Sequence, residues 1–270
     1  PLSAVMLGVV MASSSAAAQS FDELENSPDH LLRYTECLKL ARREPLLALP
    51  VAEKWNADGG GLGARHCVAV ATFQSGRYPQ AAAQFAAIAR DMGQDRPGLR
   101  AELWAQAGQA WIEAGQPEKA AESQSKALEL KAGDPELWID RGLSHAAMQA
   151  WPRAISDFDK ALELRPDDVE ILVLRAAAWR NARNPEKALA DIGRALRIAP
   201  DHTDALLERG FTHLASGSKA LANDDFNRVL RIVPPTSAAA HRAEAGLRGD
   251  QPGSAAPAPP NAMPKGDVKR

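Results

Sequence analysis

Histidine and cysteine are the side chains in this sequence most able to act as nucleophiles. His66 is followed directly by Cys67, a pair that could support nucleophilic catalysis if an acid stood at a suitable spacing. No such acid accompanies the pair, and no serine, cysteine or carboxylate motif of a catalytic type stands elsewhere in the sequence. We therefore assign no catalytic residues, and we expect a chain that is not an enzyme and needs no cofactor.

Three arginines recur at a fixed spacing and could form a basic ladder for an anionic ligand. An aspartate follows each arginine after 16 residues, which gives the pairs Arg141 and Asp157, Arg175 and Asp191, and Arg209 and Asp225. In the preceding segment the two corresponding positions hold Ala107 and Ser123, so both charges are lost together. This pattern favours structural ion pairs between two helices over a ligand site.

One glycine-rich stretch, formed by Gly59, Gly60, Gly61 and Gly63, could in principle cradle a phosphate. A phosphate-binding loop of this kind follows a strand and ends in Lys-Ser or Lys-Thr, and both features are missing here. We expect the stretch to end one helix and to permit a tight return into the next.

The element that must position these residues is a segment of 34 residues that recurs along the chain. Its clearest copy, residues 135–168, reads as two short amphipathic helices with Trp138, Gly142, Ala154, Phe158, Ala161 and Pro166. The next copies repeat the pattern at intervals of 34 residues, with Ala188, Ala195 and Pro200, then Ala222, Phe226 and Pro234. A period of this length predicts an all-α helical solenoid.

The repeat spacing also indicates whether two histidines could bind one metal ion. His145 and His213 occupy equivalent positions two repeats apart. Packed helices lie about 8 to 10 Å apart, whereas metal ligands need bonds of roughly 2 Å. We therefore expect no metal site and place both histidines in the core.

These residues resemble the tetratricopeptide repeat family. The family pattern is a large residue early in the first helix, Gly or Ala four positions later, Ala and an aromatic residue in the second helix, and a closing Pro. The resemblance implies a right-handed solenoid of about five to six helix-turn-helix repeats, and a concave groove that the first helices line. It implies no catalytic activity, and it suggests an exported bacterial protein of this family.

The repeats set the expected organisation of the chain. We expect repeats at 62–95, 101–134, 135–168, 169–202 and 203–236, a degenerate repeat at 29–61 and a capping helix at 237–248. Residues 19–28 are expected to form a linker. The tail, residues 249–270, is rich in Pro and Ala and is expected to be disordered.

The family resemblance also indicates which side chains face the groove. The positions concerned hold Ile139, Leu143, Val173, Ala177, Leu207 and Phe211. An apolar row of this kind suits an amphipathic helix or an apolar segment of a partner protein. The alternative, that these residues are buried against one another or under the capping helix, stays open.

The start of the chain is typical of a secretory signal. An apolar run at residues 4–12 is followed by Ala16, Ala17 and Ala18, which fits a cleavage site. We expect residues 1–18 to be a signal peptide that is truncated at its N-terminus, cleavage after Ala18, and a periplasmic or secreted protein. An Ala-rich start of a cytosolic protein is the alternative.

The only two cysteines, Cys37 and Cys67, fall in the expected first helices of the first two repeats. Consecutive first helices are neighbours in a solenoid, so a disulfide is sterically possible, and an exported protein meets a compartment that allows one. We therefore predict a disulfide between Cys37 and Cys67, with two buried free thiols as the alternative.

Composition excludes two classes of partner. The net charge of −2 and the pI near 6.4 indicate no nucleic-acid surface. No apolar run reaches the roughly 18 residues that span a bilayer, so we expect no membrane span after signal removal. The sequence favours a scaffold or adaptor in the bacterial cell envelope that binds another protein. A regulatory domain of a larger enzyme and a self-assembling homo-oligomer are the alternatives.

Overall fold

The computed structural model describes residues 28–250, and this part of the chain is built from helices without strands. The helices are α2 (Pro28–Arg43), α3 (Pro45–Ala57), α4 (Gly61–Gln74), α5 (Tyr78–Asp91), α6 (Pro97–Glu113), α7 (Pro117–Leu130), α8 (Pro135–Ala147), α9 (Trp151–Leu164), α10 (Val169–Asn181), α11 (Pro185–Ile198), α12 (Thr203–Ala215), α13 (Lys219–Ile232) and α14 (Ala238–Arg248). The prediction of an all-α repeat solenoid is confirmed.

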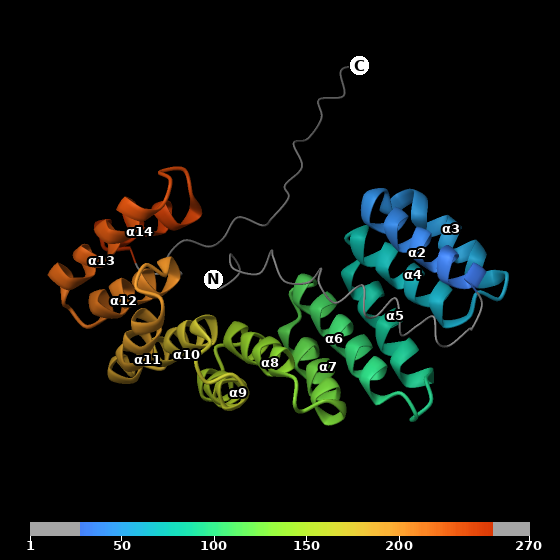
Figure 1. The fold of residues 1–270 in the computed structure, drawn as a ribbon, viewed down its shortest axis with the longest axis horizontal. Coiled ribbons are helices and arrows are strands. Elements are labelled where there is room, and N and C mark those ends of the chain that lie inside the picture. The colour runs from blue at the N-terminus through green and yellow to red at the C-terminus, as the bar shows by residue number, and fades with distance from the viewer. Residues whose placement is uncertain (1–27, 251–270) are drawn as a thin grey trace, which may run out of the picture.

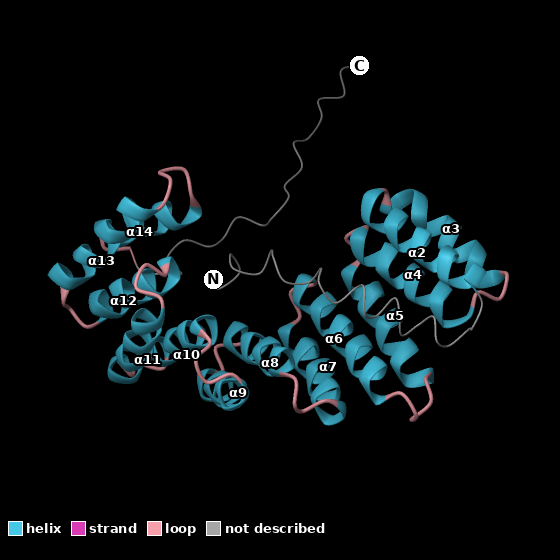
Figure 2. Cartoon of the chain, viewed as in Figure 1, coloured by secondary structure: helices cyan, strands magenta, loops and turns pink. Residues whose placement is uncertain are grey.

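The helices form an arch of antiparallel pairs (Figure 1). The first helices α6, α8 and α10 line the inner side of the arch, and the second helices α7, α9 and α11 form its outer side. Short loops join all the described helices (Figure 2). From α6 to α13, each first helix packs against the second helix of its own pair and against the second helix of the preceding pair. At the C-terminal end, α14 packs against α12 and α13.

Helix starts follow the capping chemistry of the sequence. The Asp134 carboxylate accepts a hydrogen bond from the Glu136 amide at 3.1 Å, and Pro135 occupies the first turn of α8. The Asn184 side chain accepts a bond from the Lys187 amide in the same way at the start of α11. These caps satisfy amides that have no partner within the helix.

The repeated glycine and aromatic residue pack directly on each other. A Cβ added to Gly142 on α8 would lie 2.6 Å from the Phe158 ring on α9, and the same holds for Gly210 and Phe226 two repeats later. Both rings are buried. The small residue therefore lets the two helices of a repeat approach closely, which explains the pattern seen in the sequence.

The glycine-rich stretch lies between α3 and α4 and turns the chain back. Gly59 has a positive φ of 87°, and a Cβ on Gly60 would lie 2.4 Å from the Trp55 side chain. These constraints explain the glycines without a phosphate.

Several expectations fall outside the described residues. The proposed signal peptide, the linker up to residue 27 and the tail from residue 251 are among them. Within residues 28–250, none of the helices combines the length and the apolar character needed to cross a membrane.

Candidate binding face of the solenoid

Each of the three predicted arginine–aspartate pairs joins the two helices of one repeat. Arg175 on α10 donates from Nε and Nη2 to the two carboxylate oxygens of Asp191 on α11, at 2.8 and 2.7 Å. The other pairs are Arg141–Asp157 and Arg209–Asp225. A guanidinium held by two bonds to a mostly buried carboxylate is not available to an anionic ligand.

Two of these arginines also contact the preceding repeat. Arg175 Nη1 lies 2.7 Å from the Asp159 carboxylate on α9, and Arg141 Nη1 lies 3.1 Å from the Ser125 hydroxyl on α7. At the corresponding position before Arg209 the chain has Gly193, which has no side chain to accept such a bond. The arginines therefore hold neighbouring repeats together as well as the two helices of one repeat.

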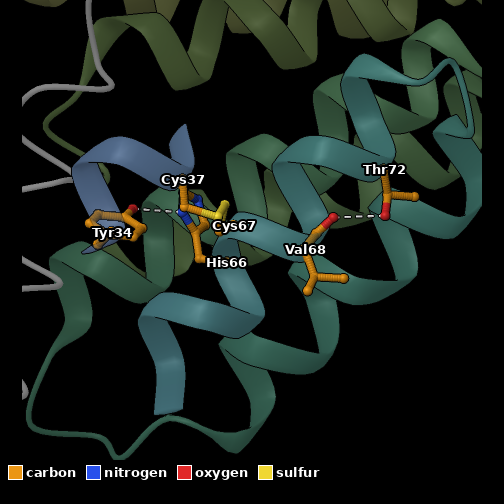
Figure 3. The surroundings of a disulfide bond; sticks show 6 residues. All are labelled: Tyr34, Cys37, His66, Cys67, Val68 and Thr72. Carbon is orange, nitrogen blue, oxygen red and sulfur yellow. Dashed lines mark hydrogen bonds between the residues drawn. A yellow bond between two sulfur atoms is a disulfide. The ribbon is translucent and has the colours of Figure 1, made fainter. Parts of the chain in front are cut away.

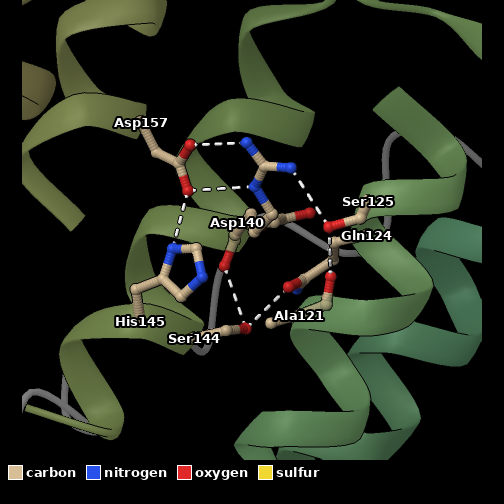
Figure 4. A network of polar contacts seen from close by, with 8 residues as sticks. Ala121, Gln124, Ser125, Asp140, Ser144, His145 and Asp157 are labelled. Atoms are coloured by element: carbon tan, nitrogen blue, oxygen red, sulfur yellow. Dashed lines mark hydrogen bonds and ion pairs between the residues drawn. The ribbon is translucent and has the colours of Figure 1, made fainter. Parts of the chain in front are cut away.

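His145 belongs to the same network rather than to a metal site. Its Nδ1 lies 2.9 Å from the Asp157 carboxylate, which also receives Arg141 (Figure 4). Burial acts to raise the pKa of Asp157, but the hydrogen bonds from His145 and Arg141 outweigh it and lower that pKa below its usual range. Among residues 28–250 there is no group of three potential metal ligands, around His213 or elsewhere.

His66 lies in a buried polar relay between three first helices. Its Nδ1 lies 2.7 Å from the Tyr34 hydroxyl on α2 (Figure 3). Its Nε2 lies 2.8 Å from the Gln106 Oε1 on α6. An amide oxygen can only accept, so Nε2 carries the proton and Nδ1 accepts from Tyr34. Burial lowers the pKa of His66 to about 4. This arrangement makes His66 a neutral structural group and not the partner of a nucleophilic cysteine.

Cys37 on α2 and Cys67 on α4 are joined by a disulfide next to this relay (Figure 3). Their Cα atoms are 6.2 Å apart, and both side chains are buried. The bridge holds the first repeat to the second.

The predicted apolar row is not an open groove along its whole length. Ile139 and Leu143 on α8 are partly exposed, but Val173 and Ala177 on α10 are buried. On α12 the exposed fraction is 0% for Leu207 and 2% for Phe211. The expectation of an apolar surface spanning three repeats is therefore wrong for four of its six residues.

The position of α12 explains this burial. Phe211 packs against Phe226 on α13 with ring centroids 5.0 Å apart, and α12 also contacts α10 and the capping helix α14. The row becomes part of the core near the C-terminal cap, and its accessible part is confined to α8.

The inner helices also carry a largely buried ion pair that the sequence did not predict. Arg180 on α10 donates to the Glu208 carboxylate on α12, and the two side chains are 11% and 6% exposed. Burial raises the pKa of Glu208, and the nearby Arg180 opposes that effect. The pair occurs in one repeat only, so comparison of the copies gave no recurring signal for it.

Asp140 on α8 is a carboxylate of the inner helices without such a partner. Within residues 28–250 no hydrogen bond or ion pair reaches its carboxylate. Ser144 Oγ approaches the main-chain carbonyl of Asp140 at 3.2 Å and Gln124 Oε1 at 2.7 Å (Figure 4). Burial, together with the charges of Glu136 and Asp134, raises the pKa of Asp140 to about 7.

Repeated antiparallel helix pairs, with the first helix of each pair on the inner side of an arch, define this protein as an α-solenoid. A family model described as tetratricopeptide repeat matches residues 69–135, 139–202 and 178–237, which is more than half of the chain. The chain belongs to the tetratricopeptide repeat family.

Solved structures share this fold at low sequence identity. The C-terminal part of a TPR repeat-containing protein from Cytophaga hutchinsonii is 15% identical with a TM-score of 0.62, covering 80% of this chain and 93% of that one. MamA from Desulfovibrio magneticus RS-1 is 16% identical with a TM-score of 0.56, covering 63% and 94%. YrrB, titled a TPR protein with an unusual peptide-binding site, is 17% identical with a TM-score of 0.53, covering 71% and 96%. Comparison with curated proteins found no match.

Proposed function

We propose that the chain is a non-catalytic scaffold that binds a peptide or helix of another protein on the inner face of α8. The observation that carries the proposal is the partial exposure of Ile139 and Leu143 beside Asp140, where the equivalent apolar residues of α10 and α12 are buried. Partly exposed apolar side chains next to a carboxylate provide both contact area and a polar anchor for a peptide. The peptide-binding site named for YrrB, which has the same fold, supports this reading.

Selection of peptides from a random display library on the immobilised chain tests the proposal. We expect selected peptides to bind the wild-type chain and to lose about tenfold in affinity for Ile139→Asn/Leu143→Asn. The matched control is Leu164→Asn/Ile198→Asn, which changes two exposed apolar residues on the outer helices α9 and α11. Circular dichroism must first show that both variants have the same helicity as the wild type. Equal binding by the inner variant, or no selected peptide at all, contradicts the proposal.

We further propose that the protein acts in the bacterial cell envelope. The support is the signal-like composition of residues 1–18, which lie outside the described residues, together with the Cys37–Cys67 disulfide. N-terminal sequencing of the protein from periplasmic fractions is the test. A mature chain that starts at Gln19 is expected, and a cytosolic protein that retains residues 1–18 contradicts this location.

A second candidate function is self-association through α3. Leu46 and Leu47 follow the proline that opens this helix and are 69% and 58% exposed. The two residues after the opening prolines of α7 and α11 are Glu-Lys in both cases. Where α7 and α11 expose charges, α3 therefore exposes leucines, which are suited to burial against a second copy.

Multi-angle light scattering over a range of concentrations tests self-association. The wild-type mass is expected to rise to that of two chains, and Leu46→Glu/Leu47→Lys, which restores the residues of α7 and α11, is expected to stay at one. A wild-type chain that remains monomeric at all concentrations removes this candidate.

A further inference from the structure

On the inner helices, one carboxylate is paired with an arginine from the neighbouring repeat. Glu208 on α12 receives a hydrogen-bonded arginine, Arg180, from the neighbouring first helix α10. Glu208 is buried and the Arg180 side chain is only 11% exposed, so each charge depends on the other for the interactions lost with water.

The equivalent position two repeats earlier has the carboxylate without the arginine. Asp140 stands 68 residues before Glu208, and Ile112 on α6 stands 68 residues before Arg180. In the repeat between them both positions are apolar, with Ala146 and Leu174. The two positions therefore hold two charges on α10 and α12, two apolar residues on α8 and α10, and an isoleucine and an acid on α6 and α8.

The charged residues around Asp140 do not supply the missing cation. Asp134 and Glu136 are themselves acidic. The nearby cations are already engaged, because Lys131 forms an ion pair with Asp134 at 2.9 Å and Arg165 forms one with Glu136 at 2.7 Å. Nothing within residues 28–250 neutralises Asp140 directly.

A second carboxylate of this region is also incompletely paired. The Glu102 Oε2 on α6 is buried and has no hydrogen-bond partner within the described residues. In the following repeat the equivalent residue, Glu136, is bonded by Arg165. The residue equivalent to Arg165 is Lys131, whose ammonium bonds Asp134 instead. A buried carboxylate oxygen without a donor is costly, which points to a donor supplied from outside the chain.

We infer that Asp140 on the inner helix α8 binds an arginine or lysine side chain of the partner segment, as Glu208 binds Arg180 within the chain. The inference rests on the proposed peptide binding and names the chemistry of the partner: an apolar segment, contacting Ile139 and Leu143, that carries one basic residue. The raised pKa of Asp140 fits a partly buried carboxyl group that lies near other acids and is not paired with a cation.

Paired synthetic peptides test the inference on the full chain. Peptides selected on the wild-type protein are made with their arginines intact or replaced by citrulline, and their lysines intact or acetylated, so that the charge is lost at nearly constant shape. Affinities are measured by fluorescence polarisation for the wild type, Asp140→Asn and Ile112→Arg. The control is Asp201→Asn, which removes an exposed acid bonded to Arg228.

Removing the peptide's charge is expected to weaken its binding to the wild type and to the Asp201→Asn control about tenfold or more. For Asp140→Asn, the same change in the peptide is expected to weaken binding by less than about twofold. Ile112→Arg supplies the cation from within the chain, so it should also abolish the preference. In that variant, without any peptide, the titration of the Asp140 carboxyl followed by carbon-13 NMR should move to lower pH.

The outcomes separate this inference from the proposed function. Selected peptides that bind equally with and without charge overturn the basic partner but leave peptide binding in place. A preference that persists in Asp140→Asn assigns the cation to another residue and overturns the inference. No selected peptide on the wild type removes both.

Discussion

At the scale of single residues, Gln149 and Arg183 have unfavourable backbone conformations. Their φ angles are 57° and 59°, and the same turn in the flanking repeats holds Gly115 and Gly217, also at positive φ. A left-handed conformation costs a non-glycine residue about 1 to 2 kcal/mol, partly offset by the greater chain entropy of glycine when unfolded. Arg183→Gly should therefore raise the free energy of unfolding by about 0.5 to 1 kcal/mol.

Urea unfolding measures this gain, and the converse substitution Gly217→Arg should lower stability. Gly133→Ala serves as the control, because Gly133 has no positive φ and its added Cβ would meet nothing within 4 Å. A loss of stability in Arg183→Gly would show that its side chain makes a contact that outweighs the backbone strain.

His66 should make stability depend on pH. Its folded-state pKa is lowered to about 4, whereas the unfolded chain takes up the proton near the ordinary value of 6.5. Its contribution to stability is therefore complete above pH 6.5 and is lost as the pH falls from 6.5 to 4. The loss amounts to about 3 kcal/mol. Urea unfolding at pH 7.5 and pH 4.5 should show this slope in the wild type and a smaller one in His66→Gln. Equal slopes would contradict a buried neutral imidazole.

At this scale the sequence predicted what recurs and missed what occurs once. Arg175 and Asp191 were found because two other repeats carry the same pair. The Arg180–Glu208 pair and the relay from Tyr34 through His66 to Gln106 each occur in one place, and they join helices whose separation in space the sequence does not state.

At the scale of helices, the arginine–aspartate pairs should couple the two helices of a repeat. A double-mutant cycle with Arg175→Ala and Asp191→Ala is expected to give a coupling energy of about 1 to 3 kcal/mol, because the bonds are bidentate and largely shielded from water. The exposed pair Lys160–Glu163, with side chains 49% and 62% exposed, should give less than about 0.5 kcal/mol. Additive effects at Arg175 and Asp191 would contradict a coupling role.

The Cys37–Cys67 disulfide should stabilise the N-terminal repeats. It joins residues separated by 30 positions, and closing a loop of that length removes about 3 to 4 kcal/mol of unfolded-state entropy in the chain-entropy model. Thermal unfolding of Cys37→Ala/Cys67→Ala should show a low-temperature loss of helicity that the wild type lacks. Two titratable thiols in the native protein, detected by alkylation and mass spectrometry, would show that no bridge forms.

At the scale of the whole molecule, the sequence predicted the repeats but not which part of the inner face is accessible. Helix pairs follow from local patterns such as Gly142 and Phe158, which pack within one repeat. The exposure of Leu207 and Phe211 depends on how neighbouring repeats and α14 close over α12, which is set by contacts between repeats. For that reason the sequence identified the row of apolar residues but not where it is accessible.

The accessibility of the inner helices differs along the solenoid, and the proposed function rests on this difference. The inner helices are closed by core packing at α12 and by the Arg180–Glu208 pair, whereas α8 keeps partly exposed apolar side chains and an unpaired carboxylate. A repeat protein whose copies differ in this way can present one local site on an otherwise regular scaffold.

Hydrogen–deuterium exchange of the full chain, with and without a selected basic peptide, tests this claim most directly. We expect slower exchange on peptide binding in α6 and α8, with α12 to α14 unchanged. Protection confined to α3, to the outer helices or to the C-terminal cap would contradict a binding site on the inner face of α8.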